Sequence, residues 1–207
     1  MRTGPAIPRR AACVALAALA CALLPSPAEA HLVTTGLGPI YDGISHVLMS
    51  PDDLVPIVAM ALLAGLNGPA AGRRTLFAVT GAWLVGGAAG FVAGATVIPS
   101  AATAASFLVL GVLAAIDRRL SPGVVTALAL AVGLLHGWLN GAAIAESQRE
   151  AIGLVGIAAM TFVLVALVAA LVVSIRAAWA RVAMRVAGSW VAAIGLLMLG
   201  WSLRGTA

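Results

Sequence analysis

The chain has 207 residues, of which 62% are hydrophobic and only 9% are charged, and its mean hydropathy is +1.10. Soluble domains carry about 25% charged residues, so this composition excludes an ordinary soluble protein and predicts an integral membrane protein with the lipid bilayer as its surroundings. All 12 basic residues are arginine and are spread along the chain. The net charge of +5 therefore does not predict nucleic-acid binding.

The N-terminus has the pattern of a secretory signal peptide. A basic start precedes an apolar stretch (residues 11–24) and the small-x-small sequence Ala28-Glu29-Ala30. We expect a signal peptide over residues 1–30, removed after Ala30 together with both cysteines, and a single domain over residues 31–207. An uncleaved signal anchor and a lipoprotein attached at Cys21 are the alternatives.

Six apolar stretches follow, separated by Pro, Gly, Asn and charged residues. A spanning helix needs about 20 mainly apolar residues, so the predicted fold is an all-α membrane protein, a bundle of six transmembrane helices after the signal peptide. The expected spans are residues 42–66, 75–96, 101–116, 122–145, 151–175 and 187–203.

The arginines predict how the bundle is oriented. With the mature N-terminus outside, the connections on the inner side hold seven arginines and the outer side holds two, Arg149 and Arg204. Cytoplasmic loops are enriched in Lys and Arg. We therefore expect a multi-pass protein of the bacterial cytoplasmic (inner) membrane with both termini outside.

The second predicted span contains a ridge of small residues, Gly86-x-x-x-Gly90-x-x-x-Gly94. Such a ridge allows two helices to approach closely. Tight packing within one bundle is the first interpretation, and contact between copies in a homo-oligomer is the second.

Ionisable residues are rare in the apolar stretches, and those that remain at membrane depth are usually functional. The first span holds His46, Asp52 and Asp53, and the fourth holds His136 and Asn140. Asp52 lies about 15 Å along the first span and His136 about 13 Å from the outer end of the fourth. We therefore expect these groups at similar depth, on a polar path from the outer surface, with ligand types that suit a divalent metal ion.

The sequence Ser50-Pro51-Asp52-Asp53 is also a strong helix start, with an N-cap, a first-position proline and acids in the first turn. A helix that begins at Pro51 would leave residues 43–49 as a short or re-entrant segment, and broken helices often form ion sites at membrane depth. The aspartates would then cap the helix alone, or cap it and also bind. A continuous helix that tolerates both acids is the other alternative.

Two of the three histidines, His136 and His31, have alternative interpretations. His136 could form a structural hydrogen bond within the bundle instead of binding a metal ion. His31 would become the mature N-terminal residue, whose amino group and imidazole form a natural metal chelate, or else a simple solvated terminus. No nucleophile elbow and no His-Glu-x-x-His pair is present, so we do not expect an enzyme, and we expect no bound cofactor.

In the residues of these two polar groups, the chain resembles the HupE/UreJ family. In the family's first motif, Gly-x-x-His-Pro-x-x-Gly-x-Asp-His-Leu, the residues Gly43, His46, Asp52 and Leu54 stand in register. Asp53 occupies the position of the motif's second histidine. In the later motif, His-Gly-His-Ala-His-Gly, the chain keeps His136, Gly137 and Gly141, while Trp138 and Asn140 replace two histidines.

The resemblance implies a small polytopic protein linked to hydrogenase and urease maturation that transports nickel, sometimes cobalt. His46, Asp52, Asp53, His136 and Asn140 would then carry the metal ion, with His31 as a further ligand. The missing histidines leave the choice of metal open. A non-transporting accessory or scaffold of a metalloenzyme maturation system is the alternative. A third option is transport of another solute, with Asp53 as a proton carrier.

Overall fold

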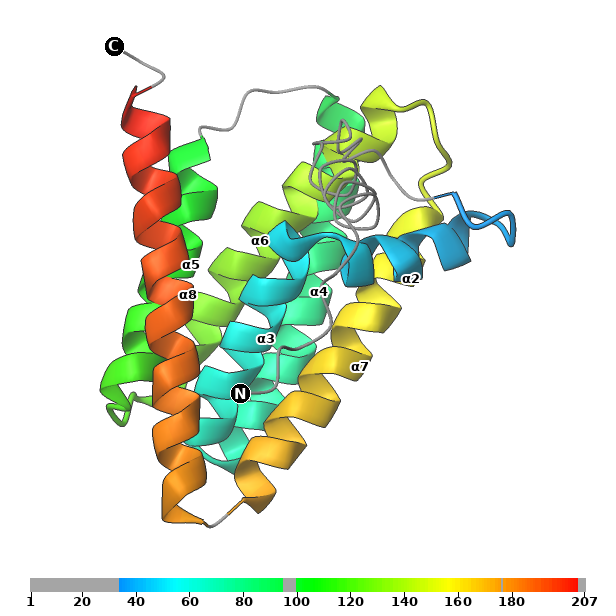
Figure 1. Cartoon of the computed structure of the whole chain (residues 1–207). Coiled ribbons are helices and arrows are strands. Elements are labelled where there is room, and N and C mark those ends of the chain that lie inside the picture. The colour runs from blue at the N-terminus through cyan, green and yellow to red at the C-terminus, as the bar shows by residue number, and fades with distance from the viewer. Residues whose placement is uncertain (1–33, 95–99, 176, 205–207) are drawn as a thin grey trace, which may run out of the picture. The chain divides into compact units, whose positions relative to one another are not determined.

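The computed structural model describes residues 34–94, 100–175 and 177–204, all of which belong to the compact unit Leu32–Ala207. The predicted signal peptide and His31 lie outside the described residues. Every regular element in the described part is a helix (Figure 1). These helices are α2 (Pro39–Met49), α3 (Pro51–Leu66), α4 (Pro69–Ala93), α5 (Ser100–Ile116), α6 (Pro122–Glu146), α7 (Gly153–Ser174) and α8 (Ala178–Arg204).

Four of these helices, α4, α6, α7 and α8, are long and apolar enough to cross a membrane, and α2 and α3 together qualify as a fifth, bent span. Helix α5 has 17 residues and is about 25 Å long at 1.5 Å per residue, which is short for a hydrocarbon core of about 30 Å. The all-helical fold is therefore confirmed for the described residues, which hold at least four candidate membrane spans, whereas the count of six spans stays a prediction.

The first predicted span is broken in two. Helices α2 and α3 meet at an angle of 74°, and Figure 1 shows α2 lying across the direction of the long helices while α3 runs along them. Ser50 between them has an extended backbone (φ −102°, ψ 100°), because Pro51 disfavours the helical conformation in the residue before it. The continuous-helix alternative is therefore wrong. Pro56 lies inside α3 without ending the helix.

Glycines bring α4 and α6 into backbone contact. A Cβ atom on Gly86 or Gly90 would overlap the backbone of α6 at Leu134 and Trp138, and one on Gly137 would overlap α4 at Trp83. Packing within one bundle is therefore the interpretation that the structure supports for this ridge. Gly94 is not part of the contact: it ends α4 with φ +70° and has no neighbour within 4 Å of a built Cβ.

Helix α6 contributes a matching ridge that the sequence analysis did not identify as a packing surface. Its three glycines are spaced four residues apart and all face α4, and they are Gly133, Gly137 and Gly141. Helix α3 contacts both members of the α4–α6 pair and both members of a second close pair, α5 with α8. Its side chains Ile57, Met60 and Leu63 are almost fully buried.

Replacing Gly90 with valine should separate α4 from α6, because two extra methyl groups and a Cβ would have to displace backbone. We expect destabilisation of about 1–3 kcal/mol or more, measured as a lower melting temperature of the detergent-solubilised protein. Gly81→Val is the matched control on the same helix, since no atom lies within 4 Å of a Cβ there. Equal melting temperatures for the two variants would contradict the glycine contact.

Candidate functional site

The site is built around the carboxylate of Asp53, the third residue of α3. Asp53 is only 5% exposed, and a buried ionised carboxylate is very unfavourable unless other groups compensate its charge. Its place in the first turn of α3 supplies part of that compensation, because the N-terminal end of a helix carries partial positive charge.

Side chains from two other helices supply the rest. His46 of α2 approaches with Nε2 at 3.2 Å from Oδ2 of Asp53, and His136 of α6 with Nδ1 at 3.4 Å from Oδ1. Asn140 donates from Nδ2 to both carboxylate oxygens at 3.0 Å. His46, Asp53, His136 and Asn140 are named the Asp53 cluster below.

Two features of the backbone bring this cluster together. The bend at Ser50 turns α2 back so that His46, which precedes the bend, reaches Asp53, which follows it. On α6, His136 and Asn140 are one helical turn apart and share a face, and the Nδ2 atom of Asn140 also donates to the carbonyl of His136 at 2.8 Å. The two polar groups, which the sequence analysis expected only at similar depth, therefore meet at Asp53, and the bend is what brings His46 into contact with it.

Asp52 is not part of the cluster. Its side chain is exposed, because adjacent residues of a helix point about 100° apart, so it is not placed to bind an ion together with Asp53. Ser50 stands at the N-cap position of α3, but its hydroxyl makes no capping bond. That hydroxyl lies 3.2 Å from Nδ1 of His46 instead.

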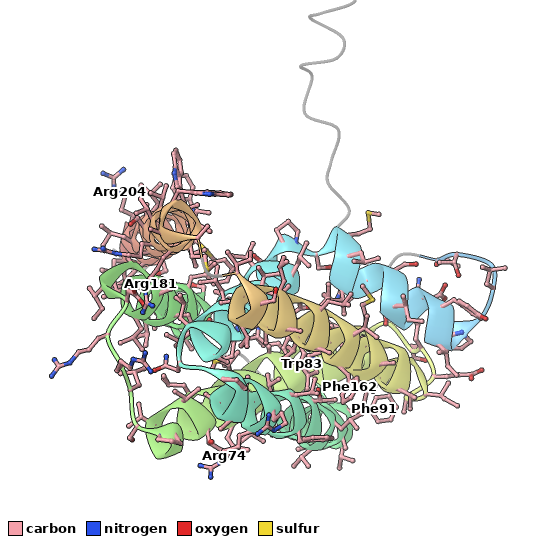
Figure 2. All side chains as sticks on the ribbon, turned by 90° about the horizontal axis from the view of Figure 1, so that it is seen from below. Arg74, Trp83, Phe91, Phe162, Arg181 and Arg204 are labelled. Carbon is pink, nitrogen blue, oxygen red and sulfur yellow. The ribbon has the colours of Figure 1, made fainter. Side chains whose placement is uncertain are left out.

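A second layer of side chains holds the other histidine. The Oγ atom of Ser106 on α5 lies 3.0 Å from Nε2 of His136, and the indole of Trp83 on α4 stacks on the imidazole with ring centroids 5.6 Å apart. Figure 2 shows Trp83 among the helices, whereas Arg74 and Arg204 extend away from them. The sequence analysis missed Ser106 and Trp83 because neither belongs to a motif or a polar run.

In the described part of the chain, no three His, Cys, Asp or Glu side chains are arranged around a point that could hold a metal ion. Asp53 instead lies between the two imidazoles and contacts both. One buried acceptor remains without a hydrogen-bond partner at the cluster, the Oδ1 atom of Asn140. An amide oxygen beside a carboxylate and two imidazoles is a donor set that fits a divalent cation.

Ser106, His136 and Asp53 are connected in the order of a hydrolase triad, Oγ to Nε2 and Nδ1 to a carboxylate. A serine hydroxyl has one hydrogen, and Ser106 donates it to the carbonyl of Thr103 at 2.7 Å. The carbonyl of Thr103 and Nε2 of His136 therefore compete for that hydrogen.

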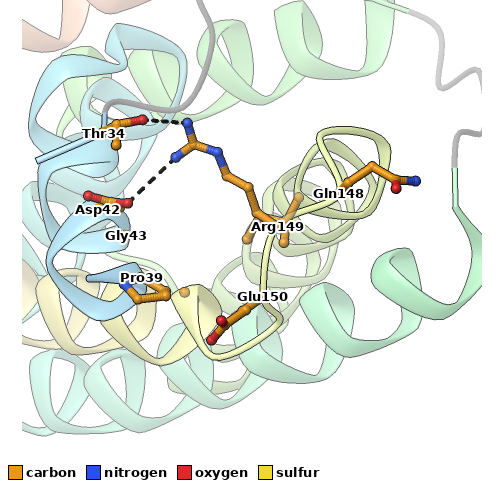
Figure 3. A pocket seen from close by; sticks show the side chains of 9 residues that line it. Thr34, Pro39, Asp42, Gly43, Gln148, Arg149 and Glu150 are labelled. Atoms are coloured by element: carbon orange, nitrogen blue, oxygen red, sulfur yellow. Dashed lines mark hydrogen bonds and ion pairs between the residues drawn. The ribbon is translucent and has the colours of Figure 1, made fainter. Parts of the chain in front are cut away.

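A pocket of about 400 Å³ opens where α6 ends and α7 begins, beside the first turn of α2 (Figure 3). The guanidinium of Arg149 extends across it to the carboxylate of Asp42 at 3.6 Å and to the hydroxyl of Thr34 at 2.6 Å. Thr35 also donates to Asp42 from its backbone and hydroxyl. Asp42 precedes His46 by one helical turn, so the pocket and the Asp53 cluster border the same short helix.

Comparison with known proteins agrees with the motifs. Neither the curated proteins nor the solved structures compared with the chain gave a match. A family model described as "HupE / UreJ protein" matches residues 19–198, a range that includes every helix of the Asp53 cluster. The chain therefore belongs to the HupE/UreJ family.

Proposed function

We propose that the chain is a permease that carries a divalent transition-metal ion, nickel or cobalt, across the bacterial cytoplasmic membrane. The observation that carries this proposal is a buried carboxylate that contacts two imidazoles and an amide within a bundle of membrane-spanning helices. A charge at bilayer depth costs about 2.5–3.5 kcal/mol on insertion scales. Retaining one there together with metal-binding side chains is typical of an ion pathway.

The ion would bind in the Asp53 cluster. The carboxylate would offset the positive charge, the imidazoles suit nickel and cobalt, and the amide oxygen of Asn140 suits a harder ion. An arriving cation would take the place of the contacts that these side chains now make with one another. Inward movement of a divalent cation down a potential of 100 mV releases about 4.6 kcal/mol, twice the value for one charge, which supports accumulation without nucleotide hydrolysis.

A second candidate function is a non-transporting accessory or scaffold protein of a metalloenzyme maturation system. The observation that favours it is the closed character of the cluster, whose members are bonded to one another and not arranged around an empty point. On this alternative, Asp53 fastens α2, α3 and α6 together and binds no ion.

The adjacent aspartates distinguish the two functions. Asp53→Asn removes the buried charge with almost no change of shape, and we expect uptake to fall at least tenfold because the cation loses its compensating charge. Asp52→Asn makes the same chemical change one residue earlier on an exposed side chain and should leave uptake unchanged.

The measurement is accumulation of nickel, cobalt, copper, zinc and manganese in a nickel-uptake-deficient host, by elemental analysis at equal levels of folded protein in the membrane. Uptake of one metal that is lost in Asp53→Asn and kept in Asp52→Asn supports the permease. No uptake by the folded wild-type chain would overturn the permease and favour the accessory role.

The pocket at Asp42 would be the outer approach to the cluster, given the predicted orientation. Asp42 and Glu150 line this pocket with a single guanidinium, that of Arg149, and a net negative charge raises the local concentration of cations. Asp42→Asn should raise the metal concentration that gives half-maximal uptake roughly fivefold, the equivalent of about 1 kcal/mol for one charge at 4 Å in water, with the maximal rate unchanged. Asp117→Asn, which removes the partner of Arg181, is the control. A lower maximal rate with unchanged half-saturation would contradict this role of Asp42.

A further inference from the structure

A groove of about 350 Å³ lies between α4 and α7, at the end of the bundle where α4 begins and α7 ends (Figure 1). Of the ten described residues that line it, only Arg73 and Ser174 have polar side chains. On α7 the lining extends from Val165 to Ser174, about 14 Å at 1.5 Å per residue. The groove is therefore elongated along the helices and almost entirely apolar.

Small residues leave the space of the groove open. Gly72 of α4 and Ala166 and Ala169 of α7 line it, and none of them has a side chain beyond Cβ. The rings of Phe77 and Phe162 meet edge to face with centroids 6.0 Å apart and join the same two helices just beyond the lining residues. The groove therefore extends from this aromatic contact toward the arginine.

The groove faces the surroundings of the bundle. Leu167 and Leu171 on α7 and Phe77 on α4 are exposed beside it, and both helices are long and apolar enough to span a membrane. In a bilayer, lipid tails therefore reach the groove. Its apolar lining offers an acyl chain van der Waals contact along its length.

Positive charge gathers at this end of the bundle. Arg73 lines the groove and Arg74 follows it; both are exposed, and within the described residues neither has an ion-pair or hydrogen-bond partner. Figure 2 shows Arg74 extending away from the helices. The other described charged residues at this end are Arg118, Arg119, Arg181, Arg185 and one acid, Asp117.

These charges discriminate between lipid headgroups. A guanidinium binds phosphate oxygens through two parallel N–H donors. No acidic residue is among those that line the groove, so the ammonium of a zwitterionic headgroup would have no partner there. A headgroup with a net negative charge keeps the full attraction, and a free phosphate would leave the apolar groove unused.

We propose that this groove binds one anionic phospholipid, with an acyl chain against Gly72, Ala166 and Ala169 and the phosphate held by Arg73 and Arg74. The site shares no residue with the Asp53 cluster or with the pocket at Asp42. The proposal therefore does not depend on metal transport.

The test is native mass spectrometry of the purified full chain in detergent, titrated with phosphatidylglycerol or with phosphatidylcholine of the same acyl chains. Each arginine near an anionic lipid surface contributes about fivefold to binding. We therefore expect one phosphatidylglycerol per chain to bind roughly tenfold or more tightly than phosphatidylcholine. Arg73→Gln should weaken phosphatidylglycerol binding about fivefold and leave phosphatidylcholine binding unchanged.

Two matched controls separate the groove from its surroundings. Arg118 is also exposed at this end of the bundle but does not line the groove, so Arg118→Gln should retain the wild-type affinity. Ala166→Leu fills the groove without a change of charge and should lose binding of both lipids. Leu167→Phe adds bulk one residue later, outside the groove, and should have no effect.

Three results would overturn the proposal. Equal binding of the two lipids by the wild-type chain would refute selection by charge. An equal loss in Arg73→Gln and Arg118→Gln would assign the binding to the general charge of this end of the bundle. Unchanged phosphatidylglycerol binding by Ala166→Leu would show that the arginines bind the phosphate without an acyl chain in the groove.

Discussion

The need to compensate one buried negative charge organises the centre of this protein. Asp53 is placed among apolar helices, where an unpaired carboxylate would be very unfavourable. Three separate segments meet there to supply partners: α2 brings His46, the start of α3 brings its helix dipole, and α6 brings His136 and Asn140. The same contacts that hold these helices together also create the arrangement of donors from which the proposed function follows.

The packing of the helices around this site depends on glycine. Helix α6, which carries His136 and Asn140, approaches α4 so closely that its glycines meet backbone atoms. Within this contact the indole of Trp83 stacks on the imidazole of His136. The glycine ridges and the polar site are therefore parts of one arrangement.

Much of this could be predicted from the sequence, and the exceptions have physical causes. Apolar runs and proline starts indicated the helices, and Ser50-Pro51 indicated the break, because both signals are local. The sequence could not show which acid is buried, because Asp52 and Asp53 are adjacent and chemically identical. Only the orientation of α3 against α6 buries Asp53 and leaves Asp52 exposed. Asp53 occupies the position of the second histidine in the family motif, so the residue type at this buried position differs from the motif. Ser106 could not be found at all, since a lone serine in an apolar helix gives no signal until its neighbour on another helix is known.

The break at Ser50 places the two sides of the cluster on helices that are held by different neighbours. His136 and Asn140 belong to a helix whose backbone is locked against α4 over three glycines, so their positions are set by the whole α4–α6 contact. His46 belongs to an 11-residue helix joined to α3 by one extended residue. Helix α2 is in turn packed backbone to backbone against α7, because a Cβ on Gly43 or on Gly156 would overlap the other helix. The two sides of the cluster are thus held by separate glycine contacts, α6 against α4 and α2 against α7.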